Sequence, residues 1–361
     1  MVTSSGFGLR VIAVCAGFRV YHVYMKANAY SPWQIAIDAA PDTEHERLSY
    51  LIAFAVLAPS SHNTQPWNFR LSGNVVELHL AADRRLPVAD PDDRQLYMSL
   101  GAALENMARA ALSIGATAVI TYKLEGALVA TIGLKAGAKP TTDYRAAMVQ
   151  RRSTRLPFGL EPIAPGMRNA VKGAQRGSTN ITLIEGKENV ETVARINADA
   201  SERSLADPVF RVELVKWVRN NWTKQPDGMP GFVQNIPGPV SLLAPVIMPR
   251  VNLGPDQAKK DFALFAASPA VVVLDVEKDE ARDWLDAGRT FEGICIEAAM
   301  QGYQTSALAS AIEDKAGAQE LSSKLHLKGR PVATLRLGKA SKEARHTPRR
   351  SAAEVTTEPA A

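Results

Sequence analysis

Cysteine is almost absent from this sequence, with only Cys15 and Cys295 among 361 residues. Two thiols exclude a disulfide framework and a cysteine zinc site. The six histidines lie far apart, and none has the helical spacing of a metal-ligand pair, so we expect no metal. The sequence also lacks a Gly-x-Ser-x-Gly elbow. No motif for a nucleophile or an acid–base pair is therefore available to carry a reaction.

Long hydrophobic runs are missing, and so are acidic side chains near the N-terminus, where the first is Asp38. The apolar run at 11–18 is far shorter than the ~20 residues of a membrane helix. An Ala-x-Ala pattern at 27–29 is typical of signal peptides, but basic residues interrupt the stretch before it. Residues 1–40 are either an arm packed on the body or a degenerate export or anchor segment. We expect a cytoplasmic protein; the alternative is export, or membrane contact, through residues 1–30.

The remaining composition is that of a globular protein, with 46% hydrophobic and 22% charged residues. The length suggests two domains or one large duplicated unit. The net charge is +5 and arginines cluster at 151–155, but no interleaved aromatics or DNA-binding motif accompany them. We therefore expect a small ligand that carries a phosphate, and no nucleic-acid partner.

Hydrophobic periodicity predicts an α+β protein. Helices are expected at 42–57, 96–114, 165–175, 190–200, 210–222 and 284–302, and strands at 69–71, 75–80, 118–123, 128–134, 181–184, 270–275 and 330–337. Residues 224–255 are apolar but broken by Gly and Pro, which is typical of either a ligand-covering lid or a partly buried surface loop. Residues 340–361 have the composition of a polar tail.

A first candidate ligand site is the stretch Pro-Ser-Ser-His-Asn-Thr-Gln-Pro-Trp at 59–67. Pro59 ends the preceding helix because proline lacks an N–H donor and clashes with the previous turn. The short hydroxyl and amide side chains that follow would let a flat polar ligand approach the backbone. The same composition is also typical of an ordinary polar turn between a helix and a strand.

A second candidate is Arg-Arg-Ser-Thr-Arg-Leu-Pro-Phe at 151–158, with three guanidiniums and two hydroxyls within five residues. Guanidiniums bind phosphate bidentately, and hydroxyls can fill the remaining phosphate oxygens. The alternative interpretation is a solvated run of charge at the end of a helix.

The two long predicted helices align without gaps at an offset of 187 residues. Gly101 falls on Gly288, Glu105 on Glu292, Ala111 on Ala298 and Gly115 on Gly302. Each helix follows a strand and ends at a glycine, where a C-cap is expected. The pattern suggests two copies of one unit. The first copy keeps the 59–67 stretch, whereas the second keeps the arginine stretch and has 173–178 in place of the loop.

Together these motifs resemble the nitroreductase-like flavoprotein family. Its members carry an Arg-x-Ser-x-(Arg/Lys)-x-Phe box and a Pro-Ser-Ser/Ala-x-Asn-x-Gln-Pro-Trp loop. The chain matches the loop at 59–67 and the box at 151–158, with Pro157 as one extra residue. Residues 329–350 resemble the family's last strand and closing Pro-Arg, and the double length is similar to the Acg-like subgroup of actinobacterial FMN-binding proteins. The resemblance covers about residues 45 to 352.

The resemblance implies a nitroreductase-like fold of two tandem half-units, each with an antiparallel-type sheet and a long central helix, packed as an intramolecular pseudo-dimer. The halves are expected at 41–140 and 141–339, with the candidate lid at 224–255 in the second half and the tail at 340–361. The chain would be a monomer that imitates the family dimer. Only one of the two interface sites would keep both motifs.

The resemblance also assigns ligand contacts. The FMN phosphate is expected to bind Arg151, Arg152, Ser153 and Arg155, assisted by Arg349 or Arg350. The ribityl chain and the ring are expected to contact Pro59, Ser60, Ser61, Asn63 and Gln65. Ala309 and Ser310 should lie against the flavin ring, where the Pro and Glu-Gly of many active members are missing.

The function implied is an FMN-dependent oxidoreductase that passes hydride from NAD(P)H to a small nitroaromatic or quinone-type acceptor. The alternative is an FMN-binding or sequestering protein of the Acg type with little or no turnover, which a lid over the flavin would favour. A third interpretation is a degenerate structural homologue that binds no flavin, and the two retained motifs argue against it.

Overall fold

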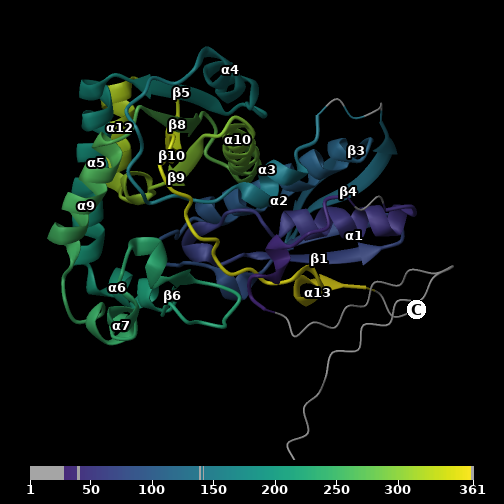
Figure 1. Cartoon of the computed structure of the whole chain (residues 1–361), viewed down its shortest axis with the longest axis horizontal. Helices are drawn as coiled ribbons and strands as arrows, with labels where there is room; N and C mark the ends of the chain where they lie inside the picture. The colour runs from purple at the N-terminus through teal and green to yellow at the C-terminus, as the bar shows by residue number, and fades with distance from the viewer. Residues whose placement is uncertain (1–27, 39–40, 138–139, 141, 359–361) are drawn as a thin grey trace, which may run out of the picture.

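The structure is a computed structural model and describes residues 28–38, 41–137, 140 and 142–358, so the expectations about residues 1–27 lie outside it. Its body holds two main sheets, and two long helices, α2 (Arg94–Ser113) and α10 (Ala281–Met300), pack on each other between them (Figure 1). The expected α+β class is confirmed.

The first sheet has the strand order β11-β1-β2-β4-β3 and lies against α1 (Glu44–Ala55) and α2. Side chains of β1 alternate between buried and exposed, as in a sheet with one solvated face. Helix α1 begins at a capping box formed by Thr43 and Glu46, the signal expected at a helix start. The strands are β1 (Trp67–Ser72), β2 (Val75–Leu80), β3 (Ala116–Glu125), β4 (Leu128–Ala136) and β11 (Thr356–Thr357).

The second sheet is antiparallel, with the order β5-β8-β10-β9. Its strands are β5 (Asn180–Glu185), β8 (Ala270–Val276), β9 (Gln304–Ala307) and β10 (Arg330–Gly338). Every residue of β8 is buried, because Val272 and Leu274 pack toward α10 whereas Val271 and Val273 pack toward α5 on the other face. A strand covered on both faces needs a continuous apolar run, which is what the sequence shows there. The covering helices are α4 (Pro165–Gly173), α5 (Lys187–Ala206), α9 (Gly254–Ala266) and α12 (Lys315–Leu325).

Helices α2 and α10 approach each other closely through one glycine on each. A Cβ built on Gly101 would lie 2.1 Å from the carbonyl oxygen of Leu285, and one on Gly288 would lie 2.0 Å from that of Met98. No side chain fits at either position without moving a backbone. The two glycines aligned by the internal repeat therefore form the crossing point of the two helices.

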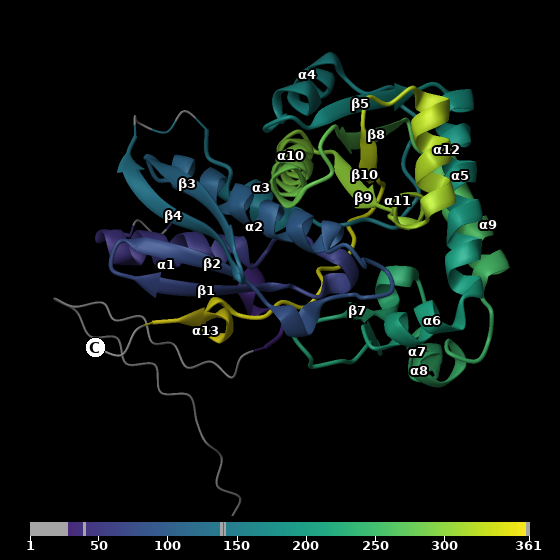
Figure 2. The ribbon, with the colours of Figure 1, turned by 180° about the vertical axis from the view of Figure 1, so that it is seen from behind.

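A lobe formed by residues 208–253 projects beside the second sheet (Figure 2). It contains α6 (Pro208–Val215), β6 (Val218–Arg219), β7 (Met229–Pro230), η4 (Gly231–Gln234), α7 (Gly238–Ser241) and α8 (Ala244–Ile247). The expected helix at 210–222 is wrong beyond Val215, where the chain turns into β6. Elements of two to four residues leave no room for a helical or strand period, which explains why 224–255 showed none.

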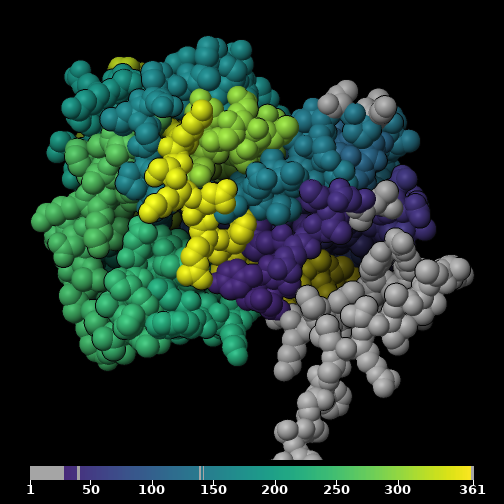
Figure 3. All heavy atoms as spheres, in the orientation of Figure 1, coloured from purple at the N-terminus to yellow at the C-terminus, as the bar shows by residue number. Residues whose placement is uncertain are grey.

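The C-terminal tail runs back from β10 to the first sheet, between the lobe and the body (Figure 3). It contains α13 (Ala352–Val355), and β11 pairs in parallel with β1, Phe69 opposite Thr356. Beside it lies η1 (Ser31–Trp33), whose Trp33 donates a hydrogen bond to the carbonyl of Thr347. The part of the polar tail up to residue 358 is thus packed against the body. Among the described helices, none has the length and apolar character needed to cross a bilayer.

Candidate functional site

A cavity of about 510 Å³ lies where the first half, the second half, the lobe and the tail meet. Small-molecule sites typically have ~300–1,000 Å³. The sequence-predicted residues in its wall are Pro59, Ser60, Ser61, Asn63, Arg151, Arg152, Ser153, Arg155, Ala309, Ser310 and Arg349. Gln65 and Arg350, which were also expected there, do not line it.

The loop after α1 has an unusual backbone. His62, Asn63 and Gln65 have φ values of 50°, 55° and 54°, in the left-handed region that residues other than glycine seldom adopt. Ser60 Oγ accepts a hydrogen bond from the backbone N–H of Gln65 at 2.9 Å, and Ser61 Oγ donates to Gln95 Oε1 at 3.1 Å. Such conformations persist only where surrounding contacts over-determine them, and they cluster at functional sites.

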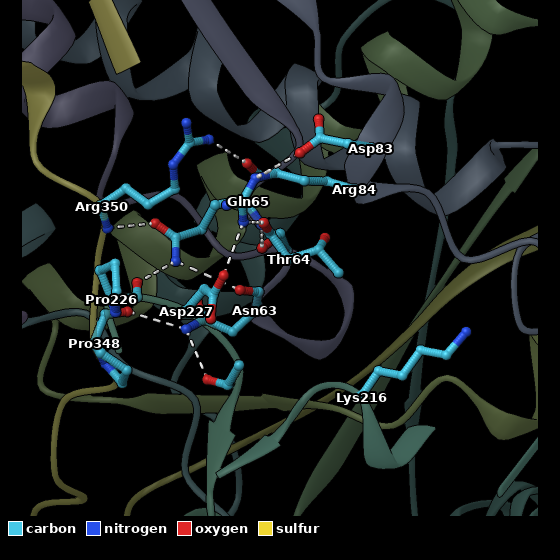
Figure 4. Close-up of polar contacts among 12 residues, drawn as sticks. Asn63, Thr64, Gln65, Asp83, Arg84, Lys216, Pro226, Asp227, Pro348 and Arg350 are labelled. Atoms are coloured by element: carbon cyan, nitrogen blue, oxygen red, sulfur yellow. Dashed lines mark hydrogen bonds and ion pairs between the residues drawn. The ribbon is translucent and has the colours of Figure 1, made fainter. Parts of the chain in front are cut away.

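Two amide side chains hold the loop in this shape (Figure 4). Asn63 Nδ2 donates to the carbonyls of Gly228 and Pro348 at 2.9 and 3.0 Å. Gln65 Nε2 donates to the carbonyl of Pro226 at 2.7 Å, and Gln65 Oε1 accepts from the Arg350 amide at 2.8 Å. The polar atoms of Gln65 are thus used to join the loop to the lobe and the tail. These bonds account for the position of the Gln65 side chain outside the cavity wall.

An ion-pair network fastens the lobe to the same loop. Arg84, in η3 (Ala82–Arg84), donates to the carbonyl of Thr64 at 2.7 Å and pairs with Asp227 at 3.1 Å. Arg219 pairs with the other oxygen of Asp227 at 2.8 Å. Both arginine side chains are mostly buried, so solvent screens these pairs less than it would at an open surface.

The arginine stretch begins where α3 (Arg145–Gln150) ends. Arg151 donates to the carbonyl of Leu57 at 2.8 Å, and its Nε lies 3.0 Å from Glu292 Oε1. Arg152 pairs with Glu343 of the tail at 3.1 Å, and Arg155 donates to Gln234 of the lobe at 3.1 Å. Each guanidinium is therefore held by a different segment, and all three line the cavity.

Arg349 brings a fourth guanidinium from the tail. Its Nη1 donates to Asn63 Oδ1 at 2.7 Å, and its Nη2 donates to the carbonyl of Leu57 at 3.3 Å. Burial, and then the charge of Arg151, lower the pKa of Arg349 to about 9, so it remains a cation at neutral pH. Burial and the charge of Arg155 lower the pKa of His62 to about 4, so His62 is neutral. The arginines, and not the histidine, give this part of the wall its positive charge.

Sequence reasoning missed Glu313, which ends α11 (Ser310–Glu313) and lines the cavity. Burial, and then the charges of Asp90 and Glu213, raise the pKa of Glu313 to about 8. A single glutamate in an otherwise apolar turn has no spacing or neighbour that marks it. Only the fold brings it to the cavity, so the sequence held no signal that could have found it.

The lobe supplies an apolar part of the wall. Its apolar residues that line the cavity are Phe210, Leu214, Val218, Met229, Val233, Ile236, Val240, Ala244, Ile247, Met248 and Leu253. Part of the segment 224–255, for which a lid and a partly buried surface loop were both expected, therefore lines the cavity. Within the described residues, no group of three or more His, Cys, Asp and Glu side chains could hold a metal ion.

No protein-family model matches the chain. Among curated proteins, it is 28% identical over 284 residues to the Mycobacterium tuberculosis protein named "Putative NAD(P)H nitroreductase Rv3131", covering 76% of this chain and 78% of the relative. It is 26% identical over 324 residues to "Putative NAD(P)H nitroreductase acg" of the same organism, covering 84% of this chain and 93% of the relative.

A solved structure, the FMN-dependent nitroreductase NfnB from Mycobacterium smegmatis in complex with NADPH, is 16% identical. The match covers 56% of this chain and 94% of that one, with a TM-score of 0.36, which is too low to carry an argument. The sequence matches nevertheless confirm the resemblance that the motifs indicated. Over most of its length the chain is similar to proteins named as NAD(P)H nitroreductases, acg among them.

Proposed function

We propose that the chain is an FMN-binding oxidoreductase that takes electrons from NAD(P)H and passes them to a small nitroaromatic or quinone-type acceptor. One observation carries the proposal. The 59–63 loop and the 151–155 arginine stretch, which belong to the two different expected half-units (41–140 and 141–339), line the same cavity. A structural turn and a solvated charge run would have no reason to meet there. The names of the relatives support the same activity.

The helix crossing supports two tandem half-units that pack as a pseudo-dimer with a nitroreductase-like fold. Gly101 contacts Leu285, and Gly288 contacts Met98. Gly288 follows Gly101 by 187 residues, and Leu285 follows Met98 by the same 187. Each contact is thus the image of the other under the repeat. Reciprocal contacts of this kind are the signature of a two-fold interface, here between two parts of one chain.

The donors in the cavity suit FMN. Guanidiniums and a hydroxyl are the groups that bind a phosphate, and Arg152, Ser153 and Arg155 offer both. Arg349 adds a further guanidinium to the wall of the cavity. We assign the phosphate to this arginine group and the ribityl chain and ring to the 59–63 loop and to Ala309 and Ser310.

When bound, FMN supplies the redox chemistry, carrying electrons from NAD(P)H to the acceptor. The chain's own residues bind and orient. The arginines fix the anionic end of the cofactor, the left-handed loop presents backbone and hydroxyl groups, and the lobe's apolar side chains keep water from the remainder of the cavity. Glu313 holds a proton near neutral pH in the cavity wall.

The lobe favours a second candidate function, that of an FMN-binding or sequestering protein with little turnover. Its apolar residues wall the cavity, and the Arg84–Asp227–Arg219 network fastens it beside the loop. A lobe that stays closed would admit FMN slowly and exclude the acceptor. The two candidates agree on the cofactor and differ in whether bound flavin can be reduced and reoxidised.

An absorbance spectrum of the purified protein tests both. We expect a yellow protein whose flavin bleaches with NADPH or NADH under anaerobic conditions and recovers its colour with a nitroaromatic or a quinone. Flavin that stays oxidised would favour the sequestering function. A colourless protein that cannot be reconstituted with FMN would exclude both.

A matched pair of arginines tests the location of the site. Arg152 lines the cavity, whereas Arg176, in the region that replaces the loop in the second half, is paired with the buried Glu105. We expect Arg152→Ala to weaken FMN binding about 10- to 100-fold, the value of one charge-assisted hydrogen bond. Arg176→Ala should leave FMN affinity within about threefold of wild type. Equal losses in a flavin-fluorescence titration would contradict the assignment.

A further inference from the structure

The outer surface of the lobe carries an unusual group of exposed apolar side chains. We call it the apolar face and define it as the exposed apolar side chains that do not line the cavity, Trp222, Leu242, Leu243, Val246 and Val251. Trp222 is 62% exposed, and both Leu242 and Val246 are 56% exposed. Four members fall within residues 242–251, and the ring of Trp222 lies against Gly238 at the start of α7.

The same short helices line the cavity on their inner side, through Val240, Ala244 and Ile247. α7 and α8 thus form a wall with apolar side chains facing both ways. A surface helix of a globular protein normally turns polar residues to solvent. A contiguous exposed apolar group marks an interaction site or a membrane contact.

The charge of the lobe selects the partner. Between 208 and 255 the chain has five basic residues and only two acidic ones, Glu213 and Asp227. Glu213 is buried and Asp227 is paired with two arginines, whereas Lys216, Lys224 and Arg250 are exposed. The freely exposed charges of this segment are therefore all cationic. Just beyond its ends, the exposed Asp207 and Asp256 are matched by the exposed Lys259 and Lys260.

A second copy of the chain is a poor partner for such a surface. A two-fold contact would bring identical cations toward each other, and like charges across an interface are unfavourable. An anionic lipid surface complements both the apolar side chains and the positive charge. Aliphatic side chains enter the boundary of the acyl chains, lysine and arginine remain with the headgroups, and tryptophan favours that interface.

We propose that the apolar face docks the protein on anionic lipid membranes, as a shallow contact that crosses no bilayer. The contact is independent of bound FMN, because none of the side chains of the apolar face lines the cavity. Docking sets the cavity wall formed by α7 and α8 against the lipid.

Vesicle co-sedimentation of the full chain tests this. The probes are vesicles of phosphatidylcholine alone and of phosphatidylcholine mixed with phosphatidylglycerol. We expect wild type to bind the anionic vesicles, and salt to weaken the binding because its electrostatic part is screened. The variant Leu242→Ser/Leu243→Ser/Val246→Ser should lose about tenfold or more of this affinity, since three aliphatic groups no longer enter the lipid.

The control variant Leu112→Ser/Val119→Ser/Leu160→Ser removes three aliphatic side chains that are exposed elsewhere on the protein, and it should bind as wild type does. All six positions are at the surface, so thermal melting should show both variants folded. Wild type that ignores anionic vesicles would overturn the proposal. Equal binding by wild type and the lobe variant would also overturn it, because the contact would then belong to another part of the chain. A dimer seen by light scattering and lost only in the lobe variant would overturn it in favour of a second copy.

Discussion

Two buried glutamates occupy equivalent positions on the two central helices and have opposite surroundings. Glu105 on α2 is paired with Arg109, Arg176 and Arg289, at 3.0, 2.7 and 3.2 Å. Glu292 on α10 has one ion pair within the described residues, with Arg151 at 3.0 Å. Both carboxyl groups are almost completely removed from solvent.

The difference shows in their acidity. Burial alone would raise the pKa of Glu105, but its three arginines outweigh burial and lower it. Burial dominates at Glu292 and raises its pKa to about 7, with Arg151 and Arg349 compensating only in part. Arg151 and Arg349 also line the cavity. The three arginines around Glu105 pair with its carboxylate and do not line the cavity. The carboxylate on α2 thus lies in a closed ionic core, whereas the arginines near the carboxyl group on α10 also face the cavity.

Replacing each glutamate by glutamine should give the largest difference in stability between the two sites. Glu105→Gln leaves three arginines without their buried anion, so we expect a loss of about 3–5 kcal/mol in the free energy of unfolding. Glu292→Gln should stay within about 1 kcal/mol of wild type near neutral pH, because its raised pKa means that the folded site already favours a neutral group. Urea denaturation of both variants measures the contrast.

The pH dependence of the stability should also differ between the two glutamate variants. The pKa of Glu105 is lowered on folding, so its stabilising effect is present above the ordinary glutamate range and disappears as pH falls. The loss of unfolding free energy caused by Glu105→Gln should therefore become smaller at acidic pH. The pKa of Glu292 is raised, so wild type loses stability as pH rises through about 7, and Glu292→Gln should gain on it there. Parallel pH profiles for the two variants would contradict the assigned environments.

Substitution of either glycine at the crossing of α2 and α10 should cause an intermediate loss of stability. Gly101→Ala and Gly288→Ala each place a Cβ at about 2 Å from a facing carbonyl oxygen, so the helices must separate. Overpacking of this kind costs about 1–3 kcal/mol or more. If the halves are related by a pseudo-two-fold, the two losses should be equal within ~0.5 kcal/mol.

Gly173→Ala is the matched control for that pair. Gly173 is also helical, but a Cβ there meets nothing within 4 Å, so the change should be neutral or stabilise slightly. Thermal melting compares all three variants. A large loss for Gly173→Ala, or for only one of the two crossing glycines, would argue against a reciprocal interface.

The sequence predicted those elements whose signals are local. The continuous apolar run of β8, the alternation in β1 and β2 and the acidic start of α1 all correspond to observed elements. The loop and the arginine stretch were recognised because each has an unusual composition over a few residues. The repeat identified Gly101 and Gly288 as equivalent, although nothing in the sequence required them to touch.

Features that depend on distant parts of the chain could not be predicted in this way. β11 has two residues, and it exists only because the tail returns to the edge beside Phe69. The amide of Gln65 is directed away from the cavity by partners at Pro226 and Arg350, more than a hundred residues further along the chain. The short helices of the lobe have too few turns to create a period.

A further pH-dependent effect concerns Glu313, the cavity carboxyl whose pKa is raised to about 8 by burial and then by Asp90 and Glu213. In the unfolded chain this group ionises near its ordinary value of 4.5, whereas in the folded protein it stays protonated until about pH 8. The stability of wild type should therefore fall as pH rises across that window, because the unfolded state releases a proton that the folded state retains. Glu313→Gln removes this ionisable group. The melting temperature of the variant should therefore rise relative to that of wild type between about pH 5 and pH 8. Glu161→Gln, at an exposed position, should show no such trend, and a constant difference between Glu313→Gln and wild type would mean that the cavity leaves Glu313 hydrated.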